Sequence, residues 1–140
     1  MAEFTSTTIQ TVAAGQNLPF TETAVKGTNC INHRAGAGNV TLRGLTNQCK
    51  ALFKVSFGGN IAIPTGGTVG AISVALAVGG EALNSATAIV TPAAVDQYSN
   101  VFTAVFVEVP RGCCVTVALK NTSTQAISIA NSNLTIERTA

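Results

Sequence analysis

The sequence predicts an all-β protein, built as an antiparallel sandwich or jelly roll in one domain. Within its 140 residues, short segments rich in Val, Ile, Ala and Thr alternate apolar with polar side chains. Clusters of Gly, Pro and Asn separate these segments about every ten residues, the spacing of turns in such folds. A helical pattern is lacking, because β-branched residues and Pro92 interrupt the alanine-rich stretch 86–94.

Three segments show the clearest strand patterns. In residues 49–57 one face is apolar and the other carries lysines, as expected for a strand with one buried side. Residues 69–78 alternate large apolar with small side chains, and the glycines at 79–80 predict a two-residue hairpin turn. Residues 101–109 are apolar on both faces. We expect further strands at 8–12, 18–21, 30–33, 40–42, 113–119, 127–129 and 134–136, with a turn at 110–112.

The doubly apolar segment 101–109 predicts self-association. Only 10% of the residues are charged, against roughly 25% in typical soluble domains. Without helices to cover the sheet, a second copy of the chain is the expected cover for the outer side of this strand. The predicted interface residues are Val101, Phe102, Val105, Phe106 and Val107. A lysine in place of Phe106 or Val105 is expected to dissociate or unfold the protein.

The charge distribution excludes several classes of function. Six acidic residues, eight basic residues and one histidine give little material for catalysis, so we expect neither an enzyme nor a cofactor. A net charge of +2 without a basic run argues against nucleic-acid binding. The apolar stretch 61–78 contains Pro64 and several glycines, which argues against membrane insertion. The N-terminus has no apolar leader, so we expect synthesis in the cytoplasm.

The four cysteines leave two alternatives open. Cys113 and Cys114 are adjacent, so on a strand they point to opposite faces, which does not suit a simple disulfide framework. Either the cysteines are small buried apolar residues, or Cys30 and Cys49 form a disulfide in an oxidising medium.

Other polar residues suggest weaker candidate sites. A metal site is not expected, since Cys30 and His33 lack enough further ligands nearby in the sequence. His33 and Arg34 form a polar cluster in the sequence. It is either part of a solvated loop or an anchor for an anionic partner. Asp96 and Glu81 provide few oxygen ligands for calcium.

An ordered set of motifs resembles the complement and tumour-necrosis-factor-like jelly rolls. The matching segments are Asn-Leu-Pro-Phe-Thr at 17–21, Ala-Leu-Phe-Lys-Val-Ser-Phe at 51–57, the hairpin 70–83, Val-Pro-Arg-Gly-Cys-Cys-Val-Thr-Val at 109–117 and Asn-Leu-Thr-Ile-Glu-Arg at 133–138. The resemblance extends from about residue 17 to residue 138. It implies a jelly roll of about eight strands, a homotrimer and, in some relatives, calcium near the trimer apex.

Two further segments resemble short proteins of phages and prophages of gut Firmicutes. They are Pro-Thr-Gly-Gly-Thr-Val-Gly at 64–70 and Pro-Arg-Gly-Cys-Cys at 110–114. The tip domains of collagen-like spore-surface glycoproteins have a similar layout, although this chain has no Gly-X-Y stalk. The resemblance implies a non-enzymatic virion protein: a capsid decoration protein, a head fibre or a fibre tip. The alternative is a module that binds a glycan or a receptor at a bacterial cell or spore surface.

The composition and the N-terminus complete the functional hypothesis. One tyrosine, Tyr98, and no tryptophan offer few stacking surfaces for sugars, which favours the virion role over the glycan-binding alternative. Residues 17–140 are expected to form the jelly roll. Residues 1–16 are expected to be an attachment segment or an added strand that contacts capsid or fibre proteins. On this view, deletion of residues 1–10 leaves a folded trimer that no longer attaches.

Overall fold

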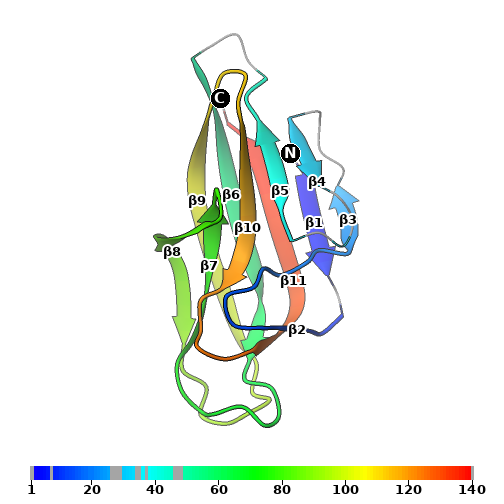
Figure 1. The fold of residues 1–140 in the computed structure, drawn as a ribbon. Helices are drawn as coiled ribbons and strands as arrows, with labels where there is room; N and C mark the ends of the chain where they lie inside the picture. Colours follow the sequence, from blue (N-terminus) through cyan, green and yellow to red (C-terminus); the bar gives the residue numbers. More distant parts are fainter. Residues whose placement is uncertain are drawn as a thin grey trace.

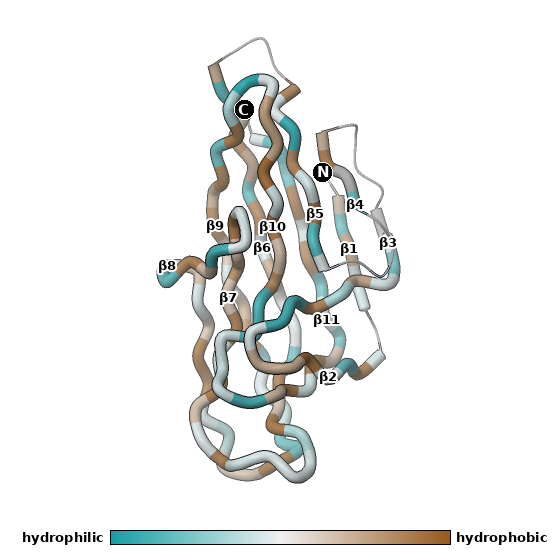
Figure 2. Tube along the Cα trace, in the orientation of Figure 1, coloured by the Kyte–Doolittle hydropathy of each residue, from teal (hydrophilic) through white to brown (hydrophobic). Residues whose placement is uncertain are grey.

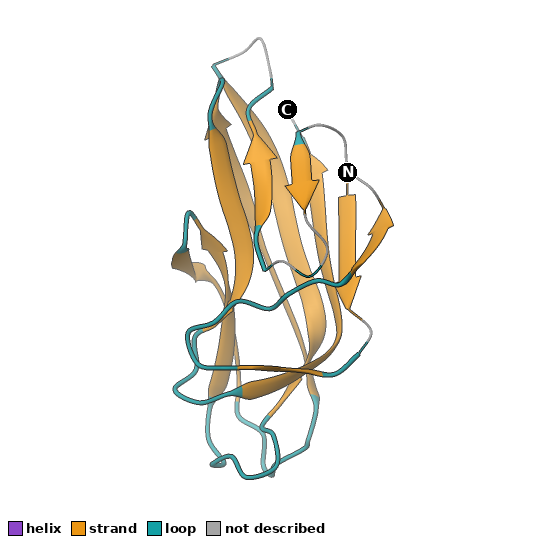
Figure 3. Ribbon diagram, turned by 45° about the vertical axis from the view of Figure 1, so that its right-hand side comes forward, coloured by secondary structure: helices purple, strands orange, loops and turns teal. Residues whose placement is uncertain are grey.

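Strands and loops make up the described part of the computed structural model, without any helix (Figure 3). The described residues are 2–6, 8–25, 30–33, 36, 38–45 and 49–139. Their strands are β1 (Ala2–Ser6), β2 (Gln10–Val12), β3 (Glu22–Val25), β4 (Ile31–His33), β5 (Val40–Arg43), β6 (Lys50–Ala62), β7 (Ile72–Val78), β8 (Glu81–Val90), β9 (Ser99–Pro110), β10 (Cys114–Asn121) and β11 (Ile127–Arg138).

The strands form two antiparallel sheets that face each other (Figure 1). The larger sheet has the order β3-β1-β11-β6-β9, and β2 also pairs with β11. The smaller sheet has the order β4-β5-β10-β7-β8. Strand β8 of the smaller sheet contacts β9 of the larger one, which brings the two sheets together along one edge. The predicted all-β antiparallel jelly roll is therefore confirmed.

The hydrophobic core fills the space between the two sheets. Hydrophobic and hydrophilic residues alternate along the long strands (Figure 2), because successive side chains on a strand point to opposite faces. In the pair β6–β9, Phe53 lies opposite Val107 and Ala51 opposite Val109, and all four side chains are buried. The largest fully buried side chains are Leu18, Phe20, Leu42, Phe53, Phe57, Ile61, Ile63, Ile72, Leu76, Leu119, Ile127 and Ile129.

The hairpin between β7 and β8 turns at Gly79 and Gly80. Their φ angles are 64° and 86°, in the left-handed region that glycine enters without a steric penalty. The predicted turn is confirmed, but its second strand, β8, was not predicted. Alanine and small polar residues make up much of Glu81–Val90, and they carry a weak strand signal.

The C-terminal strand is longer than predicted. Two short strands were expected at 127–129 and 134–136, but a single strand, β11, covers both. A register shift between Ala130 and Asn133 and a φ of 53° at Asn131 mark a β-bulge that keeps the pairing with β6 intact. Asparagine tolerates this conformation better than most residues with a side chain.

The N-terminal residues belong to the jelly roll. Strand β1 lies between β3 and β11, and Ala2 and Phe4 are buried in the core. Residues 18–21 are not a strand, although Leu18 and Phe20 are both buried in the core. The domain boundary expected after residue 16 therefore does not separate a peripheral segment from the core. Strand β1 pairs with β11 of its own chain, and a contact of this segment with capsid or fibre proteins stays a prediction.

Candidate functional site

The outer face of the larger sheet carries an exposed aromatic pair, Phe102 and Phe106 on β9. They are 67% and 61% exposed, and their spacing of four residues places both on the side of β9 that faces away from the core. Large exposed apolar side chains that lie close together are typical of interaction surfaces rather than of a free monomer surface.

Small residues lie next to Phe102 and between the two phenylalanines. Phe102 lies opposite Gly58 on β6, and a Cβ atom built on Gly58 would lie 3.9 Å from its ring. Between the two phenylalanines, Ala104 lies opposite Ser56. We call the outward residues of β6 and β9 in this region the assembly face. They are Lys54, Ser56, Gly58, Phe102, Ala104 and Phe106.

Charged groups lie at one end of the assembly face. Lys54 is opposite Phe106, and beyond it Lys50 forms an ion pair with Glu108 at 2.7 Å. Both side chains of this pair are mostly exposed, so its contribution to stability is small. The uncharged part of the face therefore centres on Phe102.

The edge next to β9 carries two further exposed apolar residues. Ile89 on β8 is 69% exposed, and Tyr98, just before β9, is 41% exposed. Since β8 contacts β9, these residues extend the apolar surface around the side of the sandwich.

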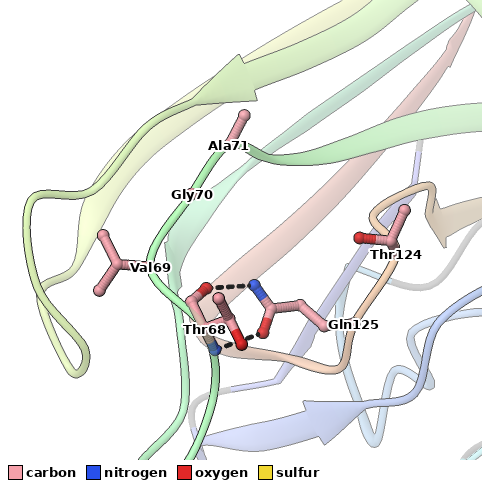
Figure 4. A pocket seen from close by; sticks show the side chains of 6 residues that line it. All are labelled: Thr68, Val69, Gly70, Ala71, Thr124 and Gln125. Carbon is pink, nitrogen blue, oxygen red and sulfur yellow. Dashed lines mark hydrogen bonds between the residues drawn. The ribbon is translucent and has the colours of Figure 1, made fainter.

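A separate open depression lies at the end of the sandwich where β7 begins (Figure 4). Its volume is about 450 Å³. We call it the loop-end depression, and its lining residues are Thr68, Val69, Gly70, Ala71, Thr124 and Gln125. They come from the loop between β6 and β7 and from the loop between β10 and β11.

Side-chain hydrogen bonds hold these two loops together. The Gln125 amide accepts a hydrogen bond from the Thr68 peptide N–H at 3.0 Å and donates one to the Thr68 carbonyl at 2.7 Å. The buried Asn121 side chain donates to the carbonyls of Val12 and Gln125, both at 3.0 Å, and accepts from the Ser123 N–H at 2.9 Å. The loops are thus fixed by amide groups rather than by ion pairs.

We expect replacement of Asn121 by alanine to lower the free energy of unfolding by about 2–3 kcal/mol, since buried carbonyls and an N–H would lose their partner. Chemical denaturation of both proteins measures the difference. Thr122→Ala is a suitable control, because this neighbouring side chain is exposed and its hydroxyl contacts only that of Ser73. Equal losses in the two variants would contradict this role of Asn121.

No protein-family model and no curated protein sequence matches the chain. Solved structures do match it along nearly its whole length. The Eiger TNF of S. frugiperda has a TM-score of 0.67 at 14% identity, with 99% of this chain and 91% of that chain covered. The globular domain of zebrafish complement 1qA has a TM-score of 0.60 at 7% identity, with 96% and 94% covered. Murine APRIL also gives 0.60 at 7%, with 95% and 97% covered.

The chain has a jelly-roll fold similar to that of these tumour-necrosis-factor-like and complement domains. At such low identities the similarity establishes the fold and leaves the function open. In the described part of this TNF-like jelly roll, no helix is long and apolar enough to cross a membrane.

The predicted interface residues divide into two groups in the TNF-like jelly roll. Phe102 and Phe106 lie on the assembly face, as an interface role requires. Val101 and Val107 are buried in the core of the chain itself, and Val105 is half-buried against that core. The correction has a simple cause. One apolar side of β9 is covered by the opposite sheet, and the exposed phenylalanines Phe102 and Phe106 lie on the other side.

All four cysteines are free in the structure, and a Cys30–Cys49 disulfide in an oxidising medium stays a prediction. Cys30 is buried, and its sulfur accepts a hydrogen bond from the Arg138 guanidinium at 3.6 Å. Cys49 is exposed just before β6. Cys113 is exposed just before β10, and Cys114 is exposed as the first residue of β10. The description of the cysteines as small buried residues therefore holds for Cys30 and is wrong for the other three.

His33 is part of the packed structure rather than of a solvated loop. It lies on β4, where its ring is 4.5 Å from that of Phe4 and 6.4 Å from that of Phe20. Arg34, its predicted partner in anion binding, lies outside the described residues. Asp96 accepts a hydrogen bond from the Thr65 hydroxyl at 2.6 Å, and the described residues contain no group of three potential metal ligands from His, Cys, Asp and Glu.

Proposed function

We propose that the protein is a non-enzymatic structural component of a phage particle that assembles as a homotrimer through the assembly face. The observation that carries the proposal is the exposed pair of Phe102 and Phe106 on a sheet face whose residues next to Phe102 are small and uncharged. Complete burial of one such side chain contributes about 1.5–3 kcal/mol. Since the pair recurs in every subunit, a closed ring buries it at each interface.

The arrangement of apolar surfaces supports a ring rather than a two-fold dimer. The assembly face and the adjoining edge with Ile89 and Tyr98 are different surfaces, and both expose apolar groups. If the edge of one subunit packs on the face of the next, the contact is heterologous, and it forms a ring when the rotation between subunits closes. The resemblance in sequence to the TNF-like jelly rolls implies that three subunits close it.

The assignment to a phage particle rests on two features of the sequence. The segments 64–70 and 110–114 are similar to those of short phage and prophage proteins. Few titratable residues are available for chemistry, which suits a decoration protein, a head fibre or a fibre tip. Capsid or fibre proteins of the same particle are the partners that this role requires.

Light scattering coupled to size-exclusion chromatography tests the assembly. We expect the mass of three chains at micromolar concentration, whereas a monomer would contradict the proposal. The phage role has a separate test. The gene is expected beside capsid, portal or terminase genes, and antibodies against the protein are expected to label the purified particles in electron micrographs. Particles that remain unlabelled, together with unrelated neighbouring genes, would argue for the cell- or spore-surface alternative.

A further inference from the structure

We propose that the loop-end depression binds a neutral saccharide. The depression lies outside the assembly face. It is concave, and its lining is polar and carries no charged group. Thr68, Val69 and Gly70 belong to the segment 64–70, and none of the lining residues belongs to the assembly face. The inference goes beyond the structural role proposed above and does not depend on the phage assignment.

The loops around the depression are held in place before any ligand arrives. Besides the Gln125–Thr68 pair, the Ser73 N–H donates to the Ser123 hydroxyl at 2.8 Å, and that hydroxyl donates to the Ser73 carbonyl at 3.0 Å. The Thr122 N–H also donates to the Ser73 carbonyl at 3.2 Å. A ligand therefore does not have to order these loops, which removes one of the main costs of binding.

Some polar groups of the lining take no part in the hydrogen bonds that fix the loops. In the part of the chain that the structure describes, the hydroxyls of Thr68 and Thr124 and the peptide groups of Val69 and Gly70 form no hydrogen bond with the protein. All four residues line the depression. The groups that hold the loops together are thus different from the groups that a ligand can bind.

The chemistry of this lining selects the class of ligand. Hydroxyls and peptide groups both donate and accept hydrogen bonds, as do the hydroxyls of a sugar ring. The small apolar surfaces of Val69 and Ala71 suit the C–H groups of such a ring, and Val69 is half exposed. No cation or carboxylate lines the depression, so a phosphate, a sialic acid or an amino sugar with a free amine would find no counter-charge there.

A glycan array followed by a nuclear magnetic resonance titration tests the site. The array should include neutral glycans, sialylated glycans and phosphorylated glycans, and the titration should use N-acetylglucosamine, galactose and rhamnose with the full chain. We expect binding of at least one neutral saccharide, with shift changes centred on the amides of residues 68–71 and 124–125. Selective binding of anionic glycans, changes centred elsewhere, or no binding at millimolar sugar would each overturn the proposal.

Gly70 offers a variant that blocks the site without disturbing the fold. A Cβ atom built there meets nothing within 4 Å, so Gly70→Leu should fill the depression and abolish binding. Thr21→Leu, which changes an exposed loop residue outside the depression, is the matched control and should bind as the unchanged protein does. Thr124→Val should weaken binding by about fivefold through the loss of one hydrogen bond. Unchanged affinity in Gly70→Leu would place the sugar elsewhere.

Discussion

Removal of residues 1–10 is expected to prevent the protein from folding. Strand β1 forms five register pairs with β11 and also pairs with β3, so its loss leaves one sheet edge unpaired and separates β3 from the sheet. It also removes the buried side chains of Ala2 and Phe4. Loss of a buried phenylalanine alone costs about 3–5 kcal/mol, a large part of the stability of a domain of this size.

Circular dichroism and thermal denaturation of the shortened protein measure this effect. Phe4→Ala should lower the free energy of unfolding by about 3–5 kcal/mol. Thr5→Ala, on the outward side of the same strand, should change it by less than about 1 kcal/mol. The sequence alone predicts the opposite result for the deletion, a folded trimer. A cooperative thermal transition close to that of the full chain would show that the sandwich closes without β1.

Charged residues at the two exposed phenylalanines are expected to separate the assembly into folded monomers. Phe102→Asp and Phe106→Lys each place a charge where the proposed contact buries an aromatic ring, and an unpaired buried charge is strongly unfavourable. Both side chains point away from the core, so the fold of the single chain should persist. Light scattering gives the mass, and circular dichroism reports whether the sheets remain.

Two further variants separate dissociation from unfolding. Val105→Lys places a charge against the core instead of on the assembly face, and it should unfold the chain rather than yield a folded monomer. Gln16→Lys adds the same charge at an exposed loop position and should leave the mass unchanged. If Phe102→Asp retains the mass of the unchanged protein, the subunits meet through another surface.

The sequence predicts those parts of the fold that depend on local alternation. Residues 49–57 show one apolar and one polar face, and they form the first part of β6. The sequence shows that both sides of β9 are apolar. It does not show which side is buried in the core of the same chain. That distinction depends on the opposite sheet, which brings Val101 and Val107 into the core and leaves Phe102 outside.

The structural features that the sequence does not predict depend on contacts between residues that are far apart in the chain. Strand β1 belongs to the core because Phe4 pairs with Leu134, and nothing within residues 2–6 indicates this partner. The loop-end depression is held by Gln125 and Thr68, which are 57 residues apart. Neither residue belongs to a motif with a known chemical role, so only the three-dimensional arrangement identifies the site.

The pairing of β1 with β11 also has consequences for how the protein is made. Glu3 and Asn133 are in contact although 130 residues separate them, and β11 lies between β1 and β6 in the larger sheet. During synthesis, β1 can pair early with β3, but its pairing with β11 must wait until residues 127–138 have emerged from the ribosome. Until then one edge of β1 and one edge of β6 are open to other chains, and such non-local pairing folds slowly. In the proposed trimer, the subunits can meet in their folded form only after β11 has been inserted between β1 and β6.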